Sequence, residues 1–132
     1  MGLTISRVLI GLAAAALAID ASLHWILFGQ NTLVAIDRSN LPPVLIANFK
    51  VLWVADVSTL LGLAAAFGWA AIRPASASVE SILMLSAIPA ALGALCFVYG
   101  APSYAGANML IAAALAAAGA IVKARMTPAV VA

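Results

Sequence analysis

Four long apolar runs, separated by short polar connections, dominate this sequence. Each run is long enough to cross a bilayer, which takes about 20 apolar residues in an α-helix. Only 8% of the 132 residues are charged, whereas a soluble domain carries about 25% charged residues. A water-facing surface cannot be built from this composition. The chain is therefore predicted to be an all-α integral membrane protein.

The runs predict one domain, residues 1–132, folded as a compact bundle of four transmembrane helices. Pro42 and Pro43 favour a helix start, because a proline in the first turn lacks only an N–H that would have no partner. Ser78 is the expected N-cap of the third helix. The expected spans are 5–28, 43–72, 79–99 and 103–122.

Charge and cysteine content exclude several classes of function. The formal net charge is only +2, which does not favour nucleic acid as a partner. Cys96 is the single cysteine, so neither an intramolecular disulfide nor a Cys-rich metal site can form. A lone His24 does not supply the axial ligands of a haem group. We therefore expect no metal and no cofactor.

Basic residues collect on one side of the predicted topology. If the four helices alternate in direction, four of the six basic residues share one side: Arg7, Arg73, Lys123 and Arg125. Cytoplasmic loops carry the excess of Lys and Arg, so both termini are expected in the cytoplasm. Segment 29–42 would then be the largest external piece. Short loops and many alanines suggest a bacterial inner membrane.

Ionisable residues interrupt the first two apolar runs. Asp20 and His24 lie in the first run, and Lys50 and Asp56 lie in the second. A charge at membrane depth costs about 3 kcal/mol on insertion scales, and such residues usually mark function. Asp20 and His24 are one helical turn apart, so the carboxylate can orient the imidazole. Lys50 is expected either to reach the outer interface or to pair with Asp20.

Other polar and aromatic residues are expected at the same outer half of the helices. Counting 1.5 Å per residue from the outer ends places Asn48 and Asn108 about 8 Å deep, with Tyr99 at the rim. The cytoplasmic half has few polar groups, which favours a pocket over a pore. Trp25 and Trp53 are expected to line that pocket, or else to anchor and pack the helices.

These residues favour acid–base chemistry on a lipophilic substrate. Asp20 would orient His24 as base or acid, and Asp56 would be a carboxylic acid kept protonated by burial. Isomerisation, cyclisation and epoxide opening fit such a site. The expected partners are membrane lipids or lipophilic small molecules.

Two other functions stay open at this point. One is proton-coupled transport by a homo-oligomer, with Asp56 or Asp20 as the exchanging carboxylate. The other is a non-catalytic accessory subunit of a larger membrane complex. The Asp20–His24 pair is also compatible with a structural hydrogen-bonded link between helices.

The first testable prediction concerns topology. A cysteine introduced at Asn31 or Ser39 should react with a membrane-impermeant thiol reagent added outside the cell, because segment 29–42 is expected to be external. Labelling from the inside only would reverse the predicted orientation.

Overall fold

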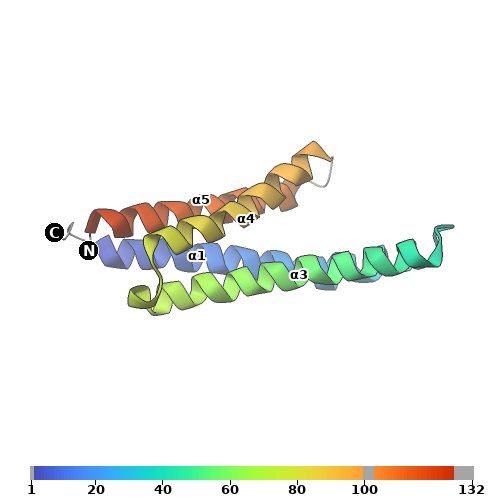
Figure 1. Cartoon of the computed structure of the whole chain (residues 1–132), viewed down its shortest axis with the longest axis horizontal. Coiled ribbons are helices and arrows are strands. Elements are labelled where there is room, and N and C mark those ends of the chain that lie inside the picture. Colours follow the sequence, from blue (N-terminus) through green and yellow to red (C-terminus); the bar gives the residue numbers. More distant parts are fainter. Residues whose placement is uncertain (1, 100–102, 127–132) are drawn as a thin grey trace.

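The computed structural model describes residues 2–99 and 103–126, and most of them are helical (Figure 1). Four stretches are long and apolar enough to span a membrane: Gly2–Ile26, Pro43–Ile72, Val79–Val98 and Tyr104–Met126. The predicted all-α class and its four long apolar helices are confirmed. In chain order the elements are α1 (Gly2–Leu23), a π-helix η1 (His24–Gly29), α2 (Gln30–Asp37), α3 (Pro43–Ile72), a 3-10 turn η2 (Pro74–Ser76), α4 (Val79–Val98) and α5 (Ser103–Met126).

Two predicted helix starts are confirmed. α3 begins at Pro43, directly after Pro42, whose extended backbone (φ −56°, ψ 143°) leads into the helix. α4 is capped by Ser78, whose side-chain oxygen accepts a hydrogen bond of 3.1 Å from the Ser81 N–H. This bond pairs one of the backbone donors that every helix start leaves without an intrahelical partner.

The segment between the first two spans is more ordered than the sequence suggested. The backbone stays helical through η1 and α2, since Leu23, Gly29 and Gln30 all have right-handed helical dihedrals. This continuous helical stretch ends only near Arg38, where the Ser39 hydroxyl donates a hydrogen bond to the Ile36 carbonyl. The residue before a proline disfavours helix, which explains the break before the Pro42–Pro43 pair. Most of the expected external connection 29–42 is thus helix.

The helices pack in the order α3–α1–α5–α4. α1 contacts α3 along one side and α5 along the other, while α4 packs against α5. α3 and α4 are joined by η2 but otherwise touch little. Even so, side chains from all four helices meet in a single apolar core. α1 is therefore the central helix, and it carries two of the ionisable residues.

Small residues bring the helix backbones close together. A Cβ built on Gly119 of α5 would lie 2.6 Å from Ile10 Cγ1 of α1, and Ser6 Oγ donates a 2.8 Å hydrogen bond to the Gly119 carbonyl. Between α4 and α5, a Cβ on Gly93 would lie 2.8 Å from the Gly106 carbonyl oxygen. Such close approach is how membrane helices associate when burial from water offers no driving force.

The first helix and α3 reach further than α4 and α5. Figure 1 shows the α1–α3 pair continuing past the tip of the α4–α5 hairpin. We call this projection, formed by α2 and residues 43–52 of α3, the arm. Within the arm, an ion pair of 2.6 Å between Lys50 Nζ and Asp37 Oδ1 connects α3 to α2.

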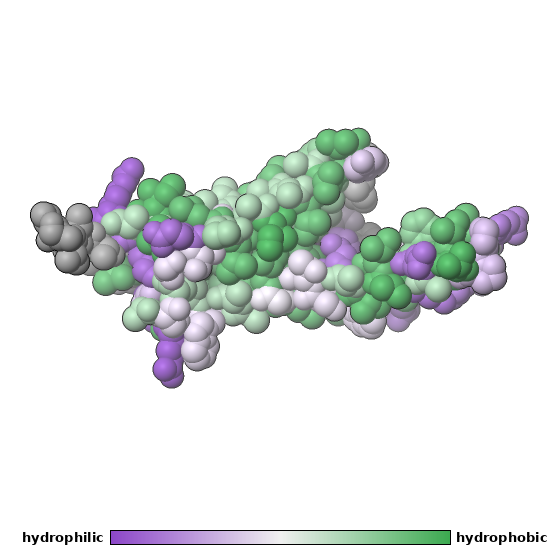
Figure 2. Space-filling view, in the orientation of Figure 1, coloured by the Kyte–Doolittle hydropathy of each residue, from purple (hydrophilic) through white to green (hydrophobic). Residues whose placement is uncertain are grey.

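The opposite end of the molecule gathers the basic residues, because α1 begins there and α5 ends there (Figures 1 and 2). Arg7 Nε donates to the Ala71 carbonyl at 2.8 Å. Lys123 Nζ donates to the Pro74 and Ala77 carbonyls, tying α5 to the α3–α4 connection. These bonds satisfy carbonyls next to the C-terminus of α3, where cations are favoured.

The glycine contacts generate a prediction about stability. Gly119→Ala should destabilise the fold by about 1–3 kcal/mol, because the new methyl group overpacks the α1–α5 contact. Gly62→Ala is the matched control, since a Cβ there meets no atom within 4 Å. It should be neutral or slightly stabilising, as alanine favours helix by up to about 1 kcal/mol. Reversible unfolding in mixed micelles measures both, and equal effects would contradict the close α1–α5 approach.

Candidate functional site

Three ionisable side chains from two helices meet where the arm leaves the hairpin. Asp20 lies in α1, His24 begins η1, and Asp56 lies in α3. His24 Nδ1 is 4.0 Å from Asp20 Oδ1, and His24 Nε2 is 3.7 Å from Asp56 Oδ2. The imidazole thus lies between two carboxyl groups, one facing each ring nitrogen. We call these three residues the acid–base site.

The exposed fraction of the side chain increases from Asp20 through His24 to Asp56. The Asp20 side chain is 2% exposed, that of His24 17% and that of Asp56 31%. In Figure 2, hydrophilic atoms are visible in the angle between the hairpin and the arm. Exposure therefore decreases along the site from Asp56 through His24 to Asp20.

Asn108 of α5 lies beside Asp20, the most buried residue of the acid–base site. Its Nδ2 donates to the Ala16 carbonyl at 3.1 Å, and its side chain lies near the Asp20 carboxyl group. The second carboxyl oxygen, Asp20 Oδ2, is buried without a hydrogen-bond partner among the residues that the structure describes. A buried polar atom of this kind is costly and usually reflects function or an ordered water molecule.

Trp53 of α3 packs beside the imidazole. The ring centroids of Trp53 and His24 are 5.4 Å apart, with the rings tilted by 45°. The indole Nε1 is buried and has no acceptor in the described part of the chain. It faces Gly29, where a Cβ would lie 3.6 Å from this nitrogen. The aromatic ring fixes the His24 side chain and excludes solvent from one of its faces.

The π-helix η1 sets the directions in which the side chains from His24 onward point. A π-helix closes its hydrogen bonds over five residues and occurs mostly as short insertions, often at functional sites. His24 is its first residue, and Gly29, which is buried against Trp53, is its last. A helical wheel drawn at 100° per residue assumes α geometry throughout. Sequence periodicity therefore placed Asp20 and His24 on one face but gave no sign of this insertion.

Lys50 does not join the acid–base site. Its Nζ lies 2.6 Å from Asp37 Oδ1, so of the two alternatives for Lys50 the pairing with Asp20 is wrong. The reason is the additional helix α2, which continues the direction of α1 alongside α3 and brings Asp37 next to Lys50. Both side chains are partly exposed on the arm, 41% for Lys50 and 54% for Asp37.

Asp56 was expected to be a buried carboxylic acid. Its side chain is 31% exposed, and its Oδ2 lies 3.7 Å from His24 Nε2.

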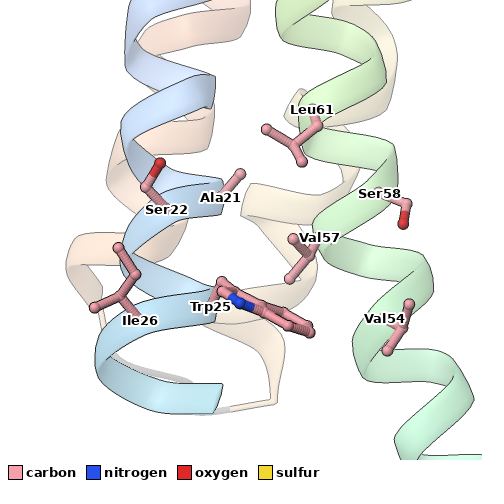
Figure 3. A pocket seen from close by; sticks show the side chains of 8 residues that line it. All are labelled: Ala21, Ser22, Trp25, Ile26, Val54, Val57, Ser58 and Leu61. Atoms are coloured by element: carbon pink, nitrogen blue, oxygen red, sulfur yellow. The ribbon is translucent and has the colours of Figure 1, made fainter. Parts of the chain in front are cut away.

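The remaining predicted ligand-binding residues are dispersed. Asn48 is exposed on the arm, and Tyr99 is 82% exposed at the end of α4. Trp25 lines a separate groove between α1 and α3, with a volume of about 400 Å³ (Figure 3). The structure thus brings together Asp20, His24, Asp56, Trp53 and Asn108, but not these three.

The half of the molecule toward the basic end is closed by apolar packing. Leu17, Leu60 and Phe67 are fully buried in this part. The buried hydroxyl groups of Ser6 and Ser86 bond to the Gly119 and Leu83 carbonyls. Apolar packing therefore separates the acid–base site from the basic end in the described part of the chain.

Comparisons with protein families, with curated proteins and with solved structures give no significant match for this chain. Within residues 2–99 and 103–126, no group of three or more His, Cys, Asp or Glu side chains could hold a metal ion. The chemistry of the site must therefore be argued from its own geometry.

The site geometry predicts which residue pairs are energetically coupled. His24→Gln and Asp56→Asn should be non-additive by more than about 0.5 kcal/mol in a double-mutant cycle, because each removes the partner of the other. Asp20→Asn and Lys50→Met should be additive, since Lys50 pairs with Asp37. Unfolding in mixed micelles measures both cycles. Coupling in the second cycle alone would contradict the arrangement described.

Proposed function

We propose that this protein is an integral membrane protein that performs acid–base chemistry on a lipophilic substrate. The observation that carries the proposal is the His24 imidazole between two carboxyl groups of graded exposure. An imidazole oriented by a buried carboxylate is a common general base, and a second carboxyl group can serve as the acid. Two such groups close together can both remove and deliver a proton at one substrate.

The burial of each group suggests its role. Asp20, almost fully buried and beside Asn108, orients His24 and does not meet the substrate. Asp56, the most exposed of the three, delivers a proton to the substrate, and His24 removes one. In an isomerisation the proton gained at one carbon balances the proton lost at another. Cyclisation and epoxide opening require the same donor and acceptor.

The surroundings of His24 suit a substrate with little polarity. The Trp53 ring can stabilise positive charge that develops on a protonated hydrocarbon, since an aromatic face attracts cations. The Asp56 side chain is 31% exposed, so a membrane-dissolved molecule can reach it. The charge distribution supports an orientation with the arm facing outward, and the short loops and many alanines support a bacterial inner membrane.

Proton-coupled transport has less support from the packing. A transport path needs a polar or hydratable lining on both sides of its site. Between the acid–base site and the basic end, the described interior is filled by residues such as Leu17 and Phe67, both 0% exposed. A proton can reach Asp56 from one side, but no hydrated route leads onward in this conformation.

The accessory-subunit hypothesis keeps one observation in its favour. The arm carries large apolar side chains that are 41–67% exposed, which a second copy or a larger membrane partner could cover: Val34, Val44, Leu45, Phe49, Val51 and Leu52. This surface is compatible with a catalytic protein as well, because assembly and catalysis do not exclude each other.

The experiment that tests the proposal uses Asp56→Asn, with Asp37→Asn as the control. Each variant replaces one partly exposed carboxylate, but Asp37 lies on the arm and pairs with Lys50. Purified protein in nanodiscs is incubated with a membrane-lipid extract in D₂O, and mass spectrometry follows deuterium uptake or addition of water. Asp56→Asn should lower turnover by about 10²–10⁴-fold, because a positioned acid contributes that much.

The control should keep its activity, since an exposed ion pair contributes only about 0–1 kcal/mol to stability. A folded Asp56→Asn protein with full turnover would remove Asp56 from the reaction. If no lipid is converted by the wild-type protein either, the catalytic proposal is wrong and the accessory role gains support.

A further inference from the structure

Cys96 of α4 lies beside the acid–base site, and the proposed reaction does not use it. Its thiol group is near the carboxyl groups of both Asp56 and Asp20. The side chain is partly buried and packs against the apolar core. α4 therefore contributes to the surroundings of the acid–base site, in addition to α1, α3 and α5.

The close approach of α4 to α5 fixes Cys96 at this level of the molecule. A Cβ built on Gly106 of α5 would lie 3.0 Å from the Cys96 Cβ, and one built on Gly93 of α4 would lie 2.8 Å from the Gly106 carbonyl oxygen. Asn108 follows Gly106 by two residues, which is about 3 Å along the helix axis, and it lies near Asp20. The contacts of α5 thus bring Cys96 and Asp20 to nearly the same level along this helix.

Asp56 and Cys96 are both partly accessible. The Asp56 side chain is 31% exposed, and Cys96 also keeps part of its surface exposed. The helices that carry them, α3 and α4, are joined through η2 and otherwise touch little, and Figure 1 shows them diverging with distance from η2. The carboxyl group and the thiol thus lie near each other on two helices that are not packed together along their length.

A buried acceptor indicates that a further polar group binds at this place. Asp20 is 1% exposed, and its Oδ2 has no hydrogen-bond partner among the residues that the structure describes. Buried acceptors without a partner are rare in proteins, and a bound ligand, directly or through a water molecule, accounts for such an atom. Because the Asp20 carboxyl group lies near both His24 and Cys96, a group that binds there is also beside Cys96.

We propose that Cys96 forms the α4 wall of the substrate site, opposite Asp56, and that its small side chain determines how bulky a substrate the site accepts. This inference rests on the proposed function and adds a specificity-determining residue to it. A free cysteine behaves as a small apolar group, which matches the lipophilic part of a substrate whose reactive end lies at His24 and Asp56. A larger group at position 96 takes the place of that lipophilic part and excludes the substrate.

The first test measures the position of Cys96 without an activity assay. Cys96 is the only cysteine of the chain, so Asp56→Cys creates a single pair of thiols. Protein in nanodiscs is treated with a short reagent that carries two methanethiosulfonate groups, and intact-mass spectrometry distinguishes a bridge from separate adducts. Asp56→Cys should form the bridge. The control Ser58→Cys should form separate adducts, because Ser58 points about 200° away from Asp56 around α3. Separate adducts in Asp56→Cys, or no reaction at Cys96, would overturn the proposal.

The second test uses the native thiol. N-ethylmaleimide adds a bulky group to Cys96 after the chain has folded, and turnover of the membrane-lipid extract should then fall about tenfold or more, because even one extra methylene group changes binding in an apolar pocket by about 10–200-fold. Cys96→Ala should be insensitive to the reagent. When Cys96→Ala is combined with Val98→Cys, the reagent should add one group without loss of turnover, since Val98 is 74% exposed at the end of α4. Full turnover of modified wild-type protein would contradict the proposal.

The same samples distinguish failure of this inference from failure of the proposed function. Full turnover of Asp56→Asn, together with loss of turnover when N-ethylmaleimide modifies the wild-type protein, would reject the acid–base role and keep Cys96 in the substrate site. Loss of turnover in Asp56→Asn, with no effect of N-ethylmaleimide on the wild-type protein, would reject the role of Cys96 and keep the acid–base role.

Discussion

The close approach of α1 to both α3 and α5 is the constraint on which the rest of this structure depends. Four of the helical stretches are long and apolar enough to span a membrane, and within a membrane burial of apolar surface gives helices little reason to associate. Gly119 and Ser6 allow α1 to meet α5, and Gly68 sits against Ala14 where α1 meets α3. With α1 fixed on both sides, Asp20 lies beside Asn108 and His24 lies opposite Asp56.

Sequence reasoning found the parts that follow from composition and regular periodicity. The start of α3, the Ser78 cap and the single face shared by Asp20 and His24 are local properties of the chain. The contact of His24 with Asp56 is not local, because it depends on the position of α3 along the axis of α1. The π-helix η1 and the helix α2 were also missed, since neither leaves a mark in a pattern read at α-helical spacing. Without α2, there was no reason to expect the ion pair of Lys50 with Asp37.

The acid–base site must meet two requirements that usually conflict in a membrane: its buried groups need polar partners, and its reactive group needs access. A buried carboxyl group needs partners, and Asp20 finds only some of them in Asn108 and His24, while its Oδ2 has none among the described residues. A reactive group needs access, and Asp56 has it. The three groups lie in a line from core to opening, which gives the buried Asp20 polar neighbours and leaves Asp56 partly exposed.

The π-helix has a mechanical consequence for the arm. If η1 changed to α geometry, one residue would leave the wide turn, and α2 would turn by about 100° and move by about 1.5 Å relative to α1. Asp37, at the end of α2, would then swing away from Lys50. The Asp37–Lys50 ion pair at the far end of the arm therefore depends on the backbone register that begins at His24.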